Sequence, residues 1–122
     1  VHGETVSESE HVPPGTNRAG IEAGADIIAH PGLITIEDAR LAAKKGVLLE
    51  LTARKAHMPG NRHVADTARS ASCGMVFDTD AHSHADLVTD EIRRRVLAEL
   101  GLDASEIEEI CKAPARFIKR YN

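Results

Sequence analysis

The sequence predicts an α/β fold in which a parallel sheet is built from alternating strands and helices. Short apolar runs alternate with helical segments of about ten residues, which is typical of such a sheet. The runs are apolar throughout, as expected of strands that are covered on both faces. Polar residues follow each run where the strand should end. In parallel α/β folds these C-terminal strand ends carry the functional groups, so they are the expected place of a site.

Capping residues and glycines mark the helix boundaries. Thr35-Ile36-Glu37-Asp38 and Asp103-Ala104-Ser105-Glu106 resemble capping boxes, and Thr89 is a further N-cap candidate. Glycines such as Gly46 end several of the helices. We therefore predict helices at 16–23, 36–45, 62–72, 90–100 and 104–112, and a separate last helix whose first turn holds Pro114. Strands are predicted at 26–29, 47–52 and 75–77, with a further strand tip at the start of the chain.

Composition limits the classes of function. The formal net charge is −4, with acidic and basic residues interspersed, so we expect neither a nucleic-acid nor a membrane partner. Cys73 and Cys111 are isolated, which suits a cytoplasmic protein. The chain begins with Val1 directly before a candidate ligand, and we expect it to be the C-terminal part of a longer protein. The alternative is a complete small domain that has lost its methionine.

The strand ends carry candidate metal ligands. Asp80 and His82 follow the apolar run at 75–77, and their side chains point the same way in an extended segment. His30 follows the strand at 26–29, and His2 stands at the opening of the chain. Aspartate oxygen and histidine nitrogen are good ligands for Zn, Mn or Fe. The alternative is a carboxylate that caps a turn beside a surface histidine. Asp78 is expected to orient a metal-bound histidine rather than bind a metal itself.

Candidate substrate-binding residues follow the strand at 47–52. Glu50, Thr52 and Arg54 alternate and would emerge together, and a guanidinium such as that of Arg54 can bind phosphate with two hydrogen bonds. His57 and His63 flank a Pro-Gly loop, where either could bind phosphate or donate a proton. The alternative for all three cationic candidates is a solvated surface side chain.

Four motifs together resemble the PHP (polymerase and histidinol phosphatase) family. They are Val-His-Gly-Glu at 1–4, Ala-His-Pro-Gly at 29–32, Leu-Glu-Leu at 49–51 and Asp-Thr-Asp-Ala-His-Ser at 78–83. Lys-Ala-Pro-Ala-Arg at 112–116 is similar to the terminal helix of that family. The resemblance implies that residues 1–122 form the C-terminal part of a distorted (βα)7 TIM-like barrel, with about its last four strands.

The resemblance also implies an activity. It predicts a metal-dependent phosphoric ester hydrolase acting on a small phosphomonoester, such as a histidinol-phosphate-like compound, or on a nucleotide. Up to three divalent ions (Zn, Mn or Fe) would bind, with His2 and His30 on one, Asp80 on a second and His82 on a third. Asp80 and His82 would be the catalytic residues. The family's opening His-x-His motif and its bridging glutamate are absent from this sequence, and Glu4 does not take the place of that glutamate.

Two alternative functions remain. An amidohydrolase-type enzyme also uses strand-end histidine and aspartate, often with a carboxylated lysine, but no lysine here sits at the tip of a predicted strand. A non-catalytic PHP-like subunit that binds RNA would have lost its ligands and gained a basic face, whereas this chain keeps the ligands and is acidic.

Overall fold

The computed structural model describes all residues from Val1 to Asn122. Its strands are β1 (Ile27–Ile28), β2 (Leu48–Thr52) and β3 (Met75–Asp78). Its α-helices are α1 (Thr16–Glu22), α2 (Ile36–Lys45), α3 (Asn61–Ala71), α4 (Asp90–Glu99) and α5 (Ala104–Lys119). Two 3₁₀ turns, η1 (Met58–Gly60) and η2 (His84–Asp86), lie in the loops after β2 and β3.

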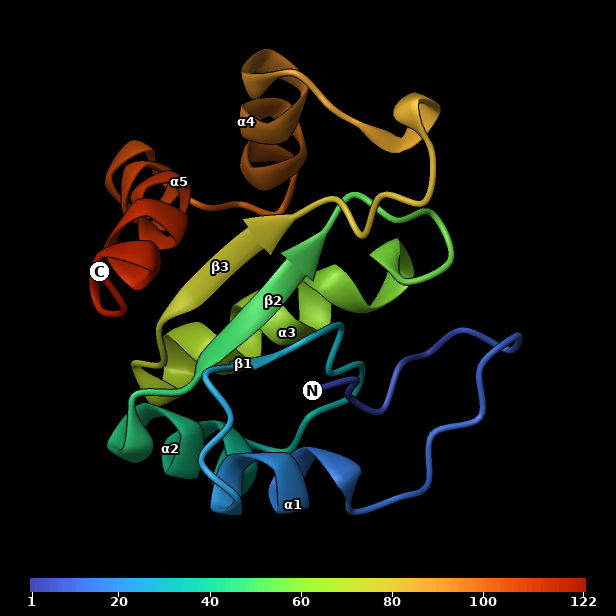
Figure 1. Ribbon diagram of the computed structural model, residues 1–122, viewed down its shortest axis with the longest axis vertical. Coiled ribbons are helices and arrows are strands. Elements are labelled where there is room, and N and C mark those ends of the chain that lie inside the picture. Colours follow the sequence, from blue (N-terminus) through green and yellow to red (C-terminus); the bar gives the residue numbers. More distant parts are fainter.

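The three strands form one open parallel sheet in the order β1-β2-β3. A single parallel bridge between His2 and Ala29 extends the sheet beyond β1. After β3 the chain continues into η2, α4 and α5 and adds no further strand (Figure 1). The predicted portion of a (βα)7 barrel is therefore wrong: a barrel needs a continuous curved sheet with every edge paired, and this sheet has three strands and is open at both edges.

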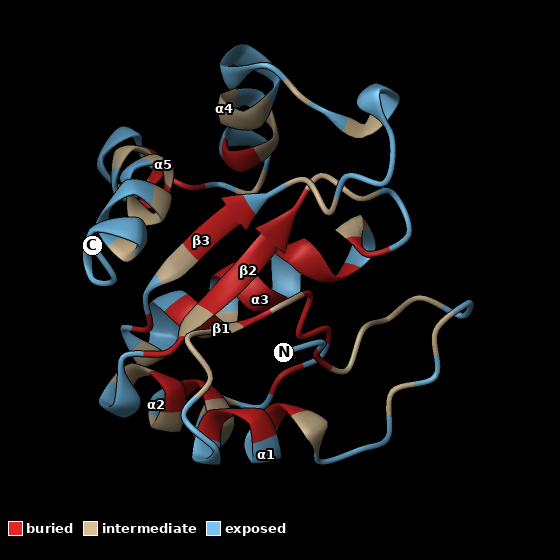
Figure 2. Cartoon of the chain, viewed as in Figure 1, coloured by how far each residue is buried: buried red, intermediate tan, exposed pale blue.

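The apolar core lies on the helix-covered face of the sheet. Helix α3 packs against β2 and α2, while α5 packs against β3 and α4 (Figure 1). Leu49 and Leu51 of β2 join Phe77 of β3 in this core, and the strands are the most deeply buried elements in Figure 2. Because side chains alternate along a strand, Glu50 and Thr52 point away from Leu49 and Leu51. The buried polar groups of β2 are therefore directed to the other face.

The helix ends follow the capping signals, with one exception. The side chains of Thr35, Thr89 and Asp103 each accept a hydrogen bond from the backbone N–H three residues on, as the sequence predicts. The separate last helix is wrong, because α5 runs without interruption from Ala104 to Lys119 with Pro114 inside it. No helix is long and apolar enough to cross a membrane.

Candidate metal centre

The loop after β1 holds His30 in an uncommon backbone conformation. Its φ is +33°, a left-handed value that is rare for a residue other than glycine. The buried carboxyl group of Glu50 accepts a hydrogen bond from the His30 backbone N–H and so ties this loop to β2. Asp80, in the loop after β3, also has a positive φ, of +46°. Such outliers persist where the surroundings hold them, and they gather at functional sites.

The amide of Asn17 joins the loops that carry His2 and His30. Asn17 is 1% exposed. Its Oδ1 accepts from the backbone N–H of Glu4 at 2.9 Å, and its Nδ2 donates to the carbonyl of Pro31 at 2.9 Å. A side chain at Gly32 would overlap the Glu4 carbonyl, so the two loops can approach closely only with glycine there. Helix α1 thus sets the distance between the two histidines.

Three imidazole rings form one cluster at the ends of the strands. The ring centroids of His2 and His30 are 4.7 Å apart with an edge-to-face arrangement. His57, from the loop between β2 and α3, stacks on His30 with ring centroids 4.0 Å apart. The structure therefore brings His2, His30 and His57 together from three segments that lie far apart in the sequence.

Carboxylates complete two groups around this cluster that could hold a metal ion. One group consists of His2, Glu10 and His30, and the other of His30, His57 and Asp80. Within each group the possible ligand atoms all lie within 4.8 Å of one another. His30 is common to both groups.

Several ring nitrogens of the cluster are buried and free of hydrogen bonds, so they are available to a metal ion. Both ring nitrogens of His30 and Nε2 of His57 are buried without a hydrogen-bond partner. Unsatisfied buried polar atoms cost free energy and are rare in folded proteins, so their gathering here is in keeping with a ligand-binding site. Burial, together with the nearby His57 and His2, lowers the pKa of His30 and favours the neutral ring that binds metals. The residues present therefore fit a divalent cation.

Glu50 lies beneath the cluster as a buried acid. Burial raises the pKa of Glu50 to about 9, and hydrogen bonding to Asp78 adds to the rise. A carboxyl group with this pKa is protonated at neutral pH, so it can accept from His30 and donate to Asp78. We attribute to Glu50 the positioning of the His30 backbone.

Arg54 is the cation next to the cluster. Its Nε lies 3.9 Å from Asp80 Oδ2, and its Nη1 lies 3.4 Å from Asp86 Oδ2. The Arg54 side chain is 31% exposed, so part of the guanidinium remains open to solvent. The structure thus places the predicted phosphate-binding arginine beside one predicted metal ligand.

His82 and His63 lie outside both groups. His82 is exposed, and its Nδ1 donates to the backbone carbonyl of Asp80 at 2.8 Å, which leaves Nε2 free. His63, in the first turn of α3, donates from Nε2 to the carbonyl of Ile34 at 2.8 Å. Metal binding by His82 and substrate binding by His63 remain predictions.

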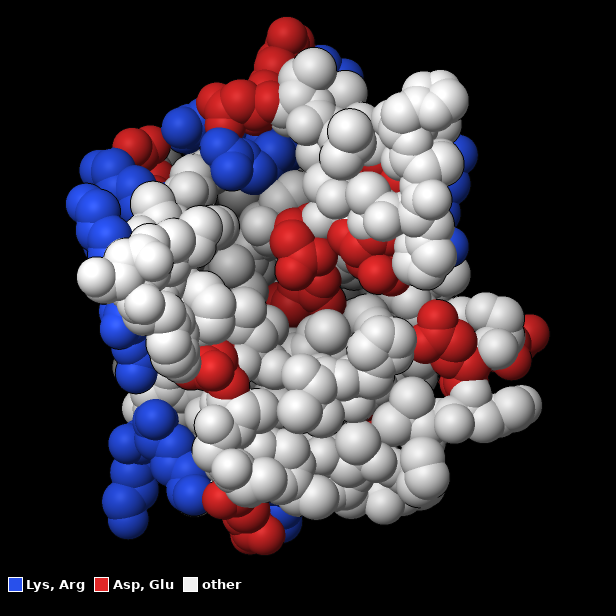
Figure 3. Space-filling model, viewed as in Figure 1, with Lys and Arg blue, Asp and Glu red and all other residues white.

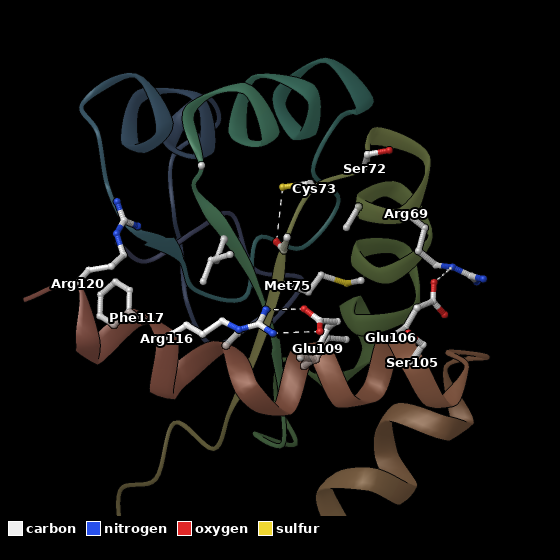
Figure 4. A pocket seen from close by; sticks show the side chains of 16 residues that line it. Arg69, Ser72, Cys73, Met75, Ser105, Glu106, Glu109, Arg116, Phe117 and Arg120 are labelled. Carbon is white, nitrogen blue, oxygen red and sulfur yellow. Dashed lines mark hydrogen bonds and ion pairs between the residues drawn. The ribbon is translucent and has the colours of Figure 1, made fainter.

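Acidic side chains gather on one face of the molecule. Figure 3 shows acidic side chains in a hollow near the middle of one face, with most of the lysine and arginine side chains along its left edge. The largest cavity lies elsewhere. It measures about 620 Å³, is lined by α3, α5 and the starts of β2 and β3, and lies at the opposite end of the strands from the histidines (Figure 4). Two of its arginines are paired with glutamates, Arg69 with Glu106 and Arg116 with Glu109.

Three contributors to the site were not predicted from the sequence. Glu10 and Thr5, whose Oγ1 lies 2.6 Å from His57 Nδ1, belong to a loop without periodicity, and Asn17 belongs to a short helix that was predicted without any role in a site. His57 was predicted to bind substrate, whereas the structure places it in a possible metal group. The one available signal was the density of histidine and carboxylate residues between positions 2 and 11.

The fold and the site together define an α/β chain with histidine and carboxylate groups that could hold a metal. No family model matches the sequence. An uncharacterized protein of Methanocaldococcus jannaschii is 37% identical to it over 122 residues, an alignment that covers 98% of this chain. The chain spans 55% of the length of that relative.

Proposed function

We propose that the chain provides the metal centre of a PHP-type phosphoesterase that hydrolyses a small phosphomonoester or a nucleotide. The observation that carries the proposal is the set of buried, unpartnered nitrogens of His30 and His57 beside the carboxylate of Asp80. Arg54 stands next to that carboxylate and supplies the positive charge that a phosphoryl group needs. The four sequence motifs that resemble the PHP family converge on this same end of the sheet. The two unpaired cysteines are in keeping with a cytoplasmic location.

The residues divide the work as follows. His30, His57, Asp80 and, from the other group, His2 would hold Zn, Mn or Fe. A bound divalent cation would act as a Lewis acid on the phosphoryl group and make water a nucleophile at neutral pH. Arg54 would bind phosphoryl oxygens with the part of its guanidinium that Asp80 and Asp86 leave free.

His82 is the candidate for proton transfer. Its Nδ1 donates to the Asp80 carbonyl, so in the neutral ring Nε2 is the acceptor, and in the protonated ring Nε2 can donate. This atom is exposed to an approaching substrate, because the His82 side chain is 63% exposed. A proton given to the leaving oxygen at this position would complete the hydrolysis.

The test measures metal content and phosphatase activity on the same samples. The chain is loaded with Zn, Mn or Fe, analysed for bound metal, and assayed with an aryl phosphate. We expect bound metal and metal-dependent hydrolysis, and we expect His82→Ala to lower kcat by about 10²–10⁴-fold while bound metal at the His30 cluster persists. His84→Ala, an exposed histidine two residues away, is the matched control and should keep its activity.

Two results would contradict the proposal. A folded chain that binds no divalent metal would remove its basis. A chain that binds metal but cleaves only amide substrates would favour the amidohydrolase alternative.

A further inference from the structure

The segment 5–14 forms a loop that is fixed at its base and lightly held along its length. At the base, Gly3 N–H donates to the Ala29 carbonyl at 2.9 Å, and Gly15 N–H donates to the Glu4 carboxylate. Within the loop the hydrogen bonds are local: the Ser7 N–H donates to Thr5 Oγ1 at 3.1 Å, and the Glu10 N–H reaches the Ser7 carbonyl at 3.4 Å. In Figure 1 the loop extends away from α1, without a helix or strand beside its tip. Its position therefore depends on its side-chain contacts.

Glu10 is the carboxylate of this loop that reaches the histidine cluster. Its Oε1 lies 3.4 Å from His57 Nε2, and its Oε2 lies 3.7 Å from His2 Nδ1. Both distances are longer than a hydrogen bond between a ring nitrogen and a carboxylate. Two donors bound to one tetrahedral ion at about 2.0–2.1 Å are roughly 3.3–3.5 Å apart, so the observed spacing suits donors arranged around a third atom.

The atoms that face Glu10 are ready to receive a cation. His57 is 2% exposed and His30 is 4% exposed, and Nε2 of His57 and both ring nitrogens of His30 have no hydrogen-bond partner. The same loop also orients His57, because Thr5 Oγ1 lies 2.6 Å from His57 Nδ1. When Nδ1 donates to Thr5, the lone pair of Nε2 points to Glu10 and to Asp80, whose Oδ2 is 3.7 Å away.

We propose that Glu10 is a metal ligand that spans the two histidine groups and closes the loop 5–14 over the metal centre. The inference rests on the metal centre of the proposed function and adds to it a ligand and a moving part. Its carboxylate offers one oxygen toward His2 and the other toward His57, so it can bind through both. Metal binding then fixes a loop that otherwise has few contacts.

The experiment compares Glu10→Gln with Glu8→Gln, an exposed glutamate of the same loop. Zn²⁺ affinity is measured by calorimetry, and the loop is probed with a protease of broad specificity, whose cleavage sites neither substitution removes and whose cuts are located by mass spectrometry. In the unsubstituted chain we expect Zn²⁺ to slow cleavage between positions 5 and 14. Glu10→Gln should weaken Zn²⁺ binding by at least about tenfold and abolish the protection. Glu8→Gln should retain both.

The outcomes separate this inference from the function on which it rests. Equal Zn²⁺ affinity and equal protection in Glu10→Gln would overturn the role of Glu10 while leaving the metal centre in place. Zn²⁺ binding without any protection of the unsubstituted loop would overturn the closure. An unsubstituted chain that binds no Zn²⁺ would overturn the metal centre and, with it, this inference.

Discussion

At the scale of single residues, the site depends on polar groups that hold the backbone rather than on the ligands alone. Asn17, Glu50 and Thr5 each bond to a loop or ring that carries a candidate ligand. Each is fully or partly buried, so its loss would leave an unsatisfied partner inside the protein. These positions should therefore be sensitive in stability as well as in metal binding.

Asn17→Ala tests this dependence. The substitution leaves the Glu4 N–H and the Pro31 carbonyl without their partner, so we expect the free energy of unfolding to fall by about 1–3 kcal/mol. Urea denaturation followed by circular dichroism measures the change. Ser70→Ala, on the exposed side of α3, serves as the control and should change little. An unchanged midpoint for Asn17→Ala would show that water replaces the amide without cost.

The sequence predicted which residues are candidate ligands better than it predicted which of them lie close together in space. His2, His30 and Asp80 follow strands, and the period of a strand indicates which way such side chains point. His57 and Glu10 lie in irregular segments, where no period relates position to direction. Their contacts arise from the loop base at Glu4 and Gly15 and from the turn η1, which are tertiary features.

At the scale of secondary structure, capping residues predicted where helices begin, whereas Pro114 led to the wrong prediction that a separate helix begins there. The α5 stripe of Ile107, Ile110 and Phe117 keeps helical spacing across Pro114. Ile107 and Ile110 are buried in the core, and their packing outweighs the local cost of a proline. A proline can thus mark either a first turn or an interior position, and sequence pattern alone does not distinguish them.

Pro114→Ala distinguishes the two descriptions of α5. Inside a helix, alanine restores an N–H that can donate to the Ile110 carbonyl and removes the clash of the ring, so we expect the free energy of unfolding to rise by about 1–3 kcal/mol. In a first turn, the same change would be neutral or unfavourable. Thermal and urea unfolding measure it. Ala115→Gly is the companion variant and should be destabilising by about 1 kcal/mol if this segment is helical.

The contact between α4 and α5 predicts a pH dependence. Arg94 donates to Asp90 at 2.7 Å and to Glu108 at 3.1 Å, and these bonds lower the pKa of both carboxyl groups. Because the folded pKa values lie below the ordinary ones, the stabilisation is present above about pH 4.5 and is lost as the pH falls through the folded values. Arg94→Gln should therefore lower Tm at pH 7 and lower it progressively less as the pH falls below about 4.

A matched substitution controls for the loss of charge in that experiment. Arg95 pairs only with Glu91 of its own helix, and both side chains are more than half exposed. Arg95→Gln should lower Tm less than Arg94→Gln at pH 7. If the two variants behaved alike at every pH, the link between α4 and α5 would contribute nothing.

At the scale of the whole molecule, the sequence predicted parallel strands with covering helices. It wrongly predicted that the sheet is part of a closed barrel. Repeated strand–helix units with apolar strands are common to open sheets and to barrels, so their pattern alone cannot separate the two. Closure depends on whether the two edge strands find partners. Here the edges are β3 and the bridge at His2, and neither meets another strand.

A metal at the histidine cluster would join parts of the molecule that are otherwise linked mainly through the sheet. Its candidate ligands come from the first loop, the end of β1 and the loops after β2 and β3.

A ligand that binds only the folded chain stabilises it, by about 2.7 kcal/mol at one hundred times its Kd. We therefore expect saturating Zn²⁺ to raise Tm by roughly 10 °C relative to the chelated chain. His30→Ala should lose most of this increment, since His30 belongs to both groups, whereas His84→Ala should keep it. Comparing the increment within each variant removes the effect of the substitution on the metal-free fold. An undiminished increment in His30→Ala would show that Zn²⁺ stabilises the chain at another place.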